Sequence, residues 1–173
     1  MAELLGPWHV RLLACDPYVE DEKFGRYGVE KVDMATLLAN SDVVTLHTTL
    51  TKETRGFFAA PQFKAMKPTA LFMNTARGGL VDQDALADAL AKDEIAQAAI
   101  DAFIDEPLAN NSPLRGFGDR ILMSAHNISH NQGSGLGPGI AWALQCVLTA
   151  LRGDLPDHIF NPEVIPKWQD RFG

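Results

Sequence analysis

Residues 71–79, LFMNTARGG, decide the fold, because a short apolar run passes there directly into a polar turn that contains two glycines. Apolar runs of the same kind occupy residues 10–14, 43–46, 98–103 and 121–123, and turn or helix signals bound each of them. Short, nearly unbroken apolar runs are typical of parallel strands that are buried on both faces. The sequence therefore predicts a buried parallel sheet.

Helical patterns lie between the predicted strands. Residues 34–39 form a short one, and Asp82 can cap a helix over residues 83–92. Near the C-terminus, Gly153 would end a helix whose apolar residues follow helical spacing: Leu144, Val147, Leu148 and Leu151. Because strands that alternate with helices form βαβ units, we predict an α/β fold with a doubly wound parallel sheet.

The length of 173 residues suits one domain with an appendage. We expect that domain over residues 1–153. Residues 154–173 contain Pro156, Pro162 and Pro166, and we expect them to form an extended tail that packs over the surface.

The composition limits the kind of partner. The chain carries 15 basic and 22 acidic side chains and a formal net charge of -7, which argues against an extended basic surface for nucleic acid or an anionic membrane. No apolar run approaches the ~18 residues of a membrane helix. Residues 1–5, MAELL, lack the basic start of a secretory signal, so we expect a cytoplasmic protein with Cys15 and Cys146 as free thiols.

Asp16 ends the first predicted strand and precedes Pro17. A carboxylate at this end of a strand can accept hydrogen bonds from both hydroxyls of an adenosine ribose, and it would repel a 2′-phosphate. Asp16 thus favours NAD over NADP as a ligand. The alternative is an ordinary turn aspartate, which is common before proline and is the better interpretation of Asp16 taken alone.

Arg77 lies in the turn over residues 74–79 that follows a predicted buried strand. Its guanidinium offers a fork of donors that matches a carboxylate, and the glycine pair lets the backbone approach a ligand closely. The alternative is a turn with a solvated arginine. Both interpretations stay open on this turn alone.

Residues 101–107, DAFIDEP, and His126 follow the next two predicted strands. Asp101 could accept a hydrogen bond from an amide, Glu106 could orient an imidazole, and a histidine exchanges protons near neutral pH. The alternatives are a solvated polar loop and a structural histidine. Convergence favours function, because every one of these groups falls at the carboxyl end of a strand, where open α/β sheets bind ligands.

Two further sequence patterns do not indicate a binding site. The glycines at 133, 135, 137 and 139 fail the spacing of a phosphate loop, and Pro138 lacks the amide hydrogen that such a loop uses. Pro138 is better placed near the start of a helix. His130 would form a metal pair with His126 only on a helix and with a third ligand, so we predict no metal.

Five stretches together resemble a known family: LLACDPY, SDVVTLHTTLTKETRGFF, MKPTALFMNTARGGLVDQDALADAL, AAIDAFIDEPL and ALRGDLPDHIFNPEV. The family is that of the D-isomer-specific 2-hydroxyacid dehydrogenases, which includes phosphoglycerate, glycerate, formate and D-lactate dehydrogenases. The blocks NTARGGLVD and D-x-F-x-x-E-P are highly specific. The resemblance implies an NAD-dependent oxidoreductase that acts on a small 2-hydroxy or 2-keto acid, commonly as a homodimer.

The resemblance also implies roles for individual residues. Catalytic roles fall to Arg77, Glu106 and His126. Contacts with NAD fall to Asp16, Thr75, Ala76, Arg77, Asp101 and His126. In this mechanism His126 accepts the hydroxyl proton, Arg77 holds the substrate carboxylate, and Glu106 stabilises the protonated imidazole, while a hydride passes between C2 of the acid and the nicotinamide.

The family places a substrate domain, a first Rossmann strand and a G-x-G-x-x-G loop ahead of the segment that matches residues 2–5. We therefore expect an incomplete Rossmann-like sheet, in a fragment of the cofactor domain that binds NAD weakly and is weak or inactive alone. The strands that end at Asp16 and Leu46 would pair directly, or strands would exchange in a dimer. The alternative function is a non-catalytic module for binding or assembly. Another class of Rossmann dehydrogenase is a third and weaker interpretation.

Overall fold

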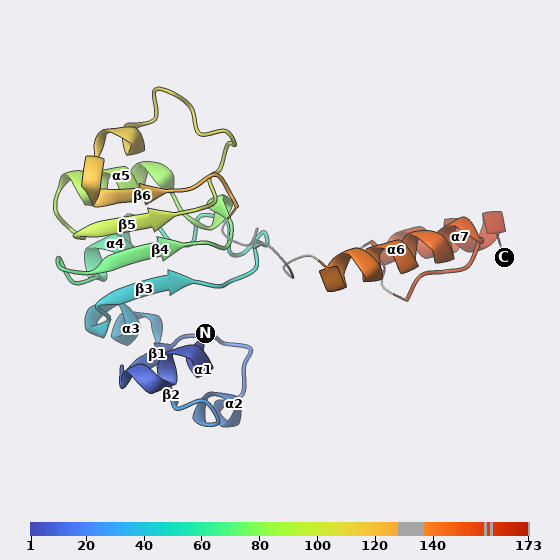
Figure 1. Cartoon of the computed structure of the whole chain (residues 1–173), viewed down its shortest axis with the longest axis horizontal. Helices are drawn as coiled ribbons and strands as arrows, with labels where there is room; N and C mark the ends of the chain where they lie inside the picture. The colour runs from blue at the N-terminus through green and yellow to red at the C-terminus, as the bar shows by residue number, and fades with distance from the viewer. Residues whose placement is uncertain (128–136, 158, 160, 173) are drawn as a thin grey trace. The chain divides into compact units, whose positions relative to one another are not determined.

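A computed structural model describes residues 1–127, 137–157, 159 and 161–172 of the chain. The chain divides into two compact units, residues 1–128 and residues 129–173 (Figure 1). This division differs from the expected boundary after residue 153, because the helix over residues 137–151 groups with the C-terminal residues.

The larger sheet of the first unit has four parallel strands in the order β3-β4-β5-β6. Its strands are β3 (Val43–Leu46), β4 (Leu71–Asn74), β5 (Gln97–Ile100) and β6 (Ile121–Met123). The predicted strands over 43–46, 71–74 and 121–123 are confirmed. The predicted strand over 98–103 is shorter, because the backbone beyond Ile100 turns to meet the segment after β6: Ser124 N donates to Ile100 O and His126 N donates to Asp101 O.

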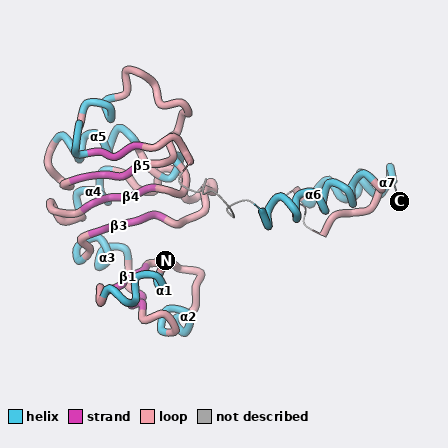
Figure 2. Tube along the Cα trace, viewed as in Figure 1, coloured by secondary structure: helices cyan, strands magenta, loops and turns pink. Residues whose placement is uncertain are grey.

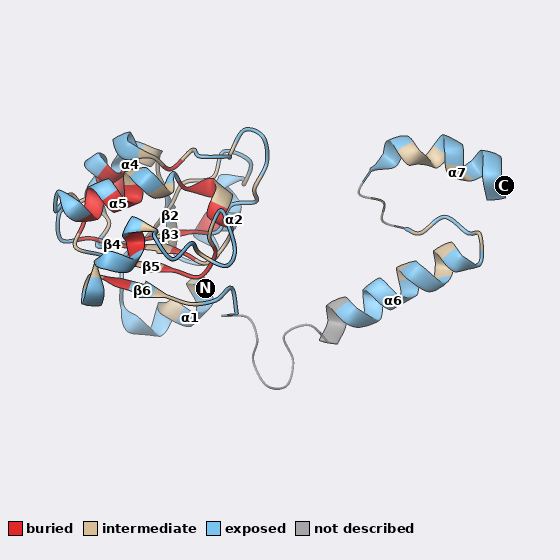
Figure 3. Cartoon of the chain, turned by 90° about the horizontal axis from the view of Figure 1, so that it is seen from above, coloured by how far each residue is buried: buried red, intermediate tan, exposed pale blue. Residues whose placement is uncertain are grey.

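One face of this sheet carries the core. Alternate strand residues such as Val44, Phe72 and Ile100 are at most 4% exposed, whereas their neighbours Val43 and Leu122 on the other face are 54% and 73% exposed. The helices α4 (Ala60–Ala65) and α5 (Gln83–Ala91) contact each other and supply the residues that fill the core. Buried positions are coloured red in Figure 3, where helices lie on both sides of the strands. The predicted α/β class with parallel strands is confirmed.

The core packs three phenylalanine rings together. The ring centroid of Phe58 lies 4.9 Å from that of Phe63 and 4.7 Å from that of Phe72, and none of the three side chains is exposed. Buried aromatic pairs at such distances add to the stabilisation from apolar burial. Asp82 caps α5 as predicted, because its Oδ1 accepts from the Asp84 and Ala85 amides at 3.1 and 3.0 Å. The helix therefore starts at a fixed position.

A second, two-stranded parallel sheet joins β1 (Leu12–Ala14) to β2 (Val29–Lys31). Its flanking helices are α1 (Ala2–Leu5), the 3-10 turn η1 (Gly6–Trp8) and α2 (Asp21–Gly25), and α3 (Met34–Asn40) leads on to β3. The residues of β1 are only half-buried, and none belongs to the main core cluster.

The predicted direct pairing of β1 with β3 is wrong, because the two strands belong to different sheets. The position of β3 is fixed by Val44 and Leu46, which pack in the main core with Leu38 of α3. β1 contributes nothing to that core, so apolar burial does not draw it against β3. Among the described residues, each of these strands pairs along one edge only.

The described part of the second unit is mainly helical. It contains α6 (Gly137–Leu151), the 3-10 turn η5 (Pro162–Val164) and α7 (Ile165–Phe172). Pro138 lies near the start of α6, as predicted. The expected extended tail is wrong for residues 165–172, because Pro162 and Pro166 take the first turns of η5 and α7, where proline is compatible with a helix.

Trp168 ties α7 to the end of α6. Its Nε1 donates to Gly153 O at 3.1 Å, and Gly153 has a φ of +89°, a conformation that suits glycine after a helix. The surface of α6 is apolar and open, since Ile140, Trp142 and Leu151 are each more than half exposed. Of the helices in the described residues, none has both the length and the apolar composition needed to cross a membrane.

Candidate active site

The carboxyl ends of the four strands lie in one row. Leu46 pairs with Asn74, Asn74 with Ile100, and Ile100 with Met123, so the loops after these strands leave from the same edge (Figure 2). Binding sites of open α/β sheets lie beyond this edge. The register therefore brings together the three loops that carry Arg77, Glu106 and His126.

Asn74 builds the turn that presents Arg77. Its side chain is 1% exposed; Nδ2 donates to Arg77 O at 2.9 Å, and Oδ1 accepts from Ala76 N at 3.1 Å. A buried amide with both ends bonded holds the backbone in one conformation. The Arg77 guanidinium also donates to Ala76 O at 2.6 Å. The sequence predicts that Asn74 lies in this turn, but it does not show that the Asn74 side chain forms the hydrogen bonds that hold the turn.

Gly78 brings this turn against the loop after β5. A Cβ atom at Gly78 would collide with the carbonyl group of Phe103 and with the Ile104 nitrogen. The two loops thus pack backbone to backbone, which only a residue without a side chain permits. Arg77 and the segment that carries Glu106 are held side by side as a result.

Glu106 and His126 form a hydrogen-bonded pair. His126 Nδ1 lies 3.0 Å from both carboxylate oxygens of Glu106, and Phe103 N donates to Glu106 Oε1 at 3.0 Å. The Phe103 amide first, and the His126 ring second, lower the pKa of Glu106 below its usual value. Glu106 is therefore an ionised acceptor at neutral pH, so Nδ1 carries its hydrogen and Nε2 of the neutral ring is left to accept a proton.

Asp101 fixes the backbone around His126. Its carboxylate is 2% exposed and accepts from Ser124 Oγ at 2.6 Å and from Asn127 N at 3.1 Å, while His126 N donates to Asp101 O at 2.9 Å. These bonds hold His126 at a φ of +52°, in the left-handed region that a residue with a side chain seldom adopts. No sequence pattern indicates the bonds from Ser124 and Asn127.

One open hollow of about 340 Å³ unites the three predicted catalytic residues. Arg77, Glu106 and His126 all line it, from three different loops. Leu50, Arg55, Phe103 and Ile104 contribute the rest of the wall with Gly78 and Gly79. The hollow therefore combines a cationic fork for an anion with a hydrogen-bonded acid–base pair.

Four of the predicted cofactor residues, Asp16, Thr75, Ala76 and Asp101, do not line this hollow. Asp16 follows β1 in the smaller sheet, and its Oδ1 accepts from Tyr18 N at 2.8 Å, the arrangement of a turn aspartate. Thr75 and Ala76 lie in the turn after β4. Asp101 accepts a hydrogen bond from His126 N through its backbone oxygen. Of the residues assigned to NAD, Arg77 and His126 alone line the hollow in the described part of the chain.

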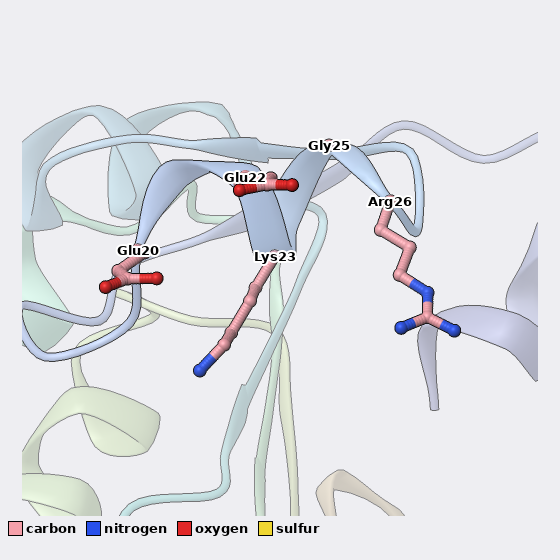
Figure 4. Close-up of a pocket in the computed structure, with 5 residues that line it drawn as sticks. All are labelled: Glu20, Glu22, Lys23, Gly25 and Arg26. Carbon is pink, nitrogen blue, oxygen red and sulfur yellow. The ribbon is translucent and has the colours of Figure 1, made fainter.

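A second hollow lies on α2 and carries no predicted site residue. It is lined by Glu20, Glu22, Lys23, Gly25 and Arg26, and Figure 4 shows Lys23 and Arg26 extending in different directions. Within the described ranges, no three His, Cys, Asp or Glu side chains are grouped so that they could hold a metal ion. His130, Gly133 and Gly135 lie outside the described residues.

Comparison with known proteins agrees with this geometry. A family model described as "D-isomer specific 2-hydroxyacid dehydrogenase, NAD binding domain" matches residues 1–127. The D-3-phosphoglycerate dehydrogenase of Archaeoglobus fulgidus is 38% identical over 157 residues, which cover 91% of this chain and 30% of that protein. The glyoxylate reductase of Korarchaeum cryptofilum is 34% identical over 158 residues, which cover 90% of this chain and 46% of that protein.

The fold matches solved structures as well. The NAD-complexed D-isomer specific 2-hydroxyacid dehydrogenase from Lactobacillus delbrueckii ssp. bulgaricus aligns with a TM-score of 0.76 and 27% identity, over 92% of this chain and 52% of that one. The predicted Rossmann-like class is thereby confirmed. The chain spans less than half of the length of the two relatives named above.

Proposed function

Because the chain belongs to the D-isomer specific 2-hydroxyacid dehydrogenase family and matches its NAD binding domain, we propose that the protein is an NAD-dependent oxidoreductase for a small D-2-hydroxy acid or the matching 2-keto acid. The observation that carries the proposal is the hollow that Arg77, Glu106 and His126 line together. When bound, NAD supplies the hydride chemistry. The residues of the chain bind the acid, orient it and move its proton.

The residues proposed to hold NAD fit such a group chemically. Asp16 is a half-buried carboxylate at the end of β1, suited to ribose hydroxyls and repulsive toward a 2′-phosphate. The other proposed contacts come from the ends of β4, β5 and β6: Thr75, Ala76, Arg77, Asp101 and His126. These positions form a continuous edge, because the three strands end in one row.

His126 is the proposed general base for oxidation and general acid for reduction. Its Nδ1 is engaged by Glu106, so Nε2 exchanges the proton of the substrate hydroxyl. The ionised Glu106 carboxylate stabilises the imidazolium that results. Arg77 would bind the substrate carboxylate through its fork of donors, which sets C2 in a fixed orientation.

An assay of NADH oxidation with a panel of 2-keto acids, run at NADH concentrations high enough to saturate a weak cofactor site, tests the proposal. Loss of the acid–base group in His126→Ala is expected to lower kcat by about 10²–10⁴-fold. Arg77→Met is expected chiefly to raise KM for the acid. Unchanged kcat in His126→Ala would remove the catalytic assignment of this histidine.

A second candidate function is a non-catalytic module for binding or assembly. The separation of the two sheets favours it, because β1 and β3 each keep an edge without a partner among the described residues. Such edges are templates for pairing with another chain. We propose a homodimer under either function, and light scattering over a range of concentrations tests it; a monomer at every concentration contradicts it.

A further inference from the structure

Gln83 reaches from the first turn of α5 to the loop that carries Glu106. It is the first residue of α5, directly after the capping Asp82, and it is half-buried. Its Oε1 accepts a hydrogen bond from Ile104 N at 2.6 Å, across 21 positions of sequence. This bond links α5, a helix with four buried residues, to the exposed residue Ile104.

The bond acts on the peptide next to the one that binds Glu106. Phe103 N donates to Glu106 Oε1 at 3.0 Å, and the following amide, that of Ile104, donates to Gln83. Two successive amides are therefore fixed, one by the helix and one by the carboxylate of the acid–base pair. If the Ile104 amide is released, the Phe103 amide loses its fixed direction toward Glu106.

The anchor is buried, whereas the segment after Phe103 is exposed. Leu86, Ala89 and Leu90 of α5 are at most 1% exposed, whereas Ile104 is 53% exposed and the Glu106 side chain is 41% exposed. Gly78 packs against the same peptide, at the Phe103 carbonyl group and the Ile104 nitrogen. Gln83 and Gly78 thus both fix the peptide between Phe103 and Ile104, just ahead of Glu106.

We infer that Gln83 is a positioning residue for the acid–base pair, holding the 103–106 segment so that the Glu106 carboxylate faces His126 Nδ1. The catalytic role of this contact rests on the proposed function. The contact itself involves no substrate and no cofactor. Gln83 touches neither reacting group, so it acts only through the loop backbone.

The test compares variants of the whole chain by NMR without ligand. Gln83→Met keeps the length of the side chain and removes the acceptor, Gln83→Asn is too short to reach Ile104, and Gln83→Glu keeps an acceptor oxygen. Gln62→Met is the matched control, because Gln62 Oε1 accepts from Ala59 N at 3.0 Å in the first turn of α4 and Gln62 does not line the hollow. Each variant is measured for amide exchange at Ile104, for the pH titration of the Glu106 carboxyl carbon and for the His126 ring nitrogen signals.

In Gln83→Met and Gln83→Asn, exchange at Ile104 is expected to rise about five-fold or more, as for the loss of one hydrogen bond. The pKa of Glu106 should move up toward its ordinary value of 4.5, and the His126 Nδ1 signal should change. Gln83→Glu should restore slow exchange at Ile104, and Gln62→Met should leave all three readings unchanged.

Two results would overturn the inference. One is faster exchange at Ile104 with unchanged Glu106 and His126 signals, which would make Gln83 merely structural. The other is no change in any reading in a folded variant; if Gln83→Met does not fold, Gln83→Asn decides. Because none of these readings uses NAD or an acid, the outcome is independent of whether the dehydrogenase assay succeeds.

Discussion

The residues that meet at the hollow could be predicted from the sequence, but the bonds that orient them could not. Arg77, Glu106 and His126 follow parallel strands, and such strands end at one edge whatever their loops do. The bonds from Ser124 Oγ to Asp101 and from Ile104 N to Gln83 join residues 23 and 21 positions apart. Their formation depends on side-chain directions that no local pattern contains.

The first residue-level prediction concerns pH and Glu106. The pKa of Glu106 is lowered by the Phe103 amide and by His126, so the ionised form stabilises the folded state above the ordinary pKa of 4.5. This stabilisation should be lost as pH falls through the lowered pKa in the folded protein. Carboxyl-carbon NMR of Glu106 and the free energy of unfolding, measured from pH 7 downward, check it.

Glu106→Gln is the control for this prediction, because it cannot ionise. Its free energy of unfolding should fall less than that of the unmodified chain across the same pH window. An equal fall in both proteins would mean that Glu106 contributes nothing to the acid sensitivity.

The second residue-level prediction concerns Gly78. In Gly78→Ala the new methyl group collides with the Phe103 backbone, which should lower the free energy of unfolding by about 1–3 kcal/mol and disturb the hollow. Chemical denaturation measures the effect. Gly25→Ala, at a helical glycine with nothing within 4 Å of the added Cβ, should instead be neutral or stabilising by about 0.4–1 kcal/mol. Equal effects at the two glycines would refute the close approach of the loops.

Among the elements, the positions of the strands could be predicted from the sequence, but the strand with which each one pairs could not. The apolar runs at 43–46, 71–74 and 121–123 coincide with β3, β4 and β6. Direct pairing of β1 with β3, one of the two expected arrangements, does not occur, because a short apolar run does not reveal which core it enters. Residues 165–172 were wrongly expected to be extended, because proline in the first turn of a helix looks the same in sequence as proline that breaks one.

The element-level prediction concerns the start of α5. Asp82→Ala removes the acceptor for the Asp84 and Ala85 amides and should lower the free energy of unfolding by about 1 kcal/mol. Asp82→Asn keeps an oxygen acceptor and should lower it by less. Because α5 also carries Gln83, the alanine variant should speed amide exchange at Ile104. If amide exchange at Ile104 is equally slow in both variants, the Asp82 cap does not stabilise the loop at Ile104.

At the scale of the molecule, the separate sheets bear on cofactor binding. Asp16 belongs to the two-stranded sheet, whereas Arg77, Glu106 and His126 belong to loops of the four-stranded one. No described strand bridges β1 and β3, so the proposed ribose and nicotinamide contacts share no continuous sheet. We therefore predict that this chain by itself binds NAD weakly or not at all. Calorimetric titration measures it, and micromolar affinity would contradict the prediction.

The central claim is that one hollow binds the carboxylate of a 2-keto acid beside the acid–base pair. The most direct measurement is an NMR titration of the labelled chain with glyoxylate and pyruvate, observing the Arg77 side chain, the Phe103 amide and the His126 ring together. All three signals should move along one saturation curve, and Arg77→Met should abolish the movement. Signals that stay still, that saturate independently, or that still move in Arg77→Met would contradict it.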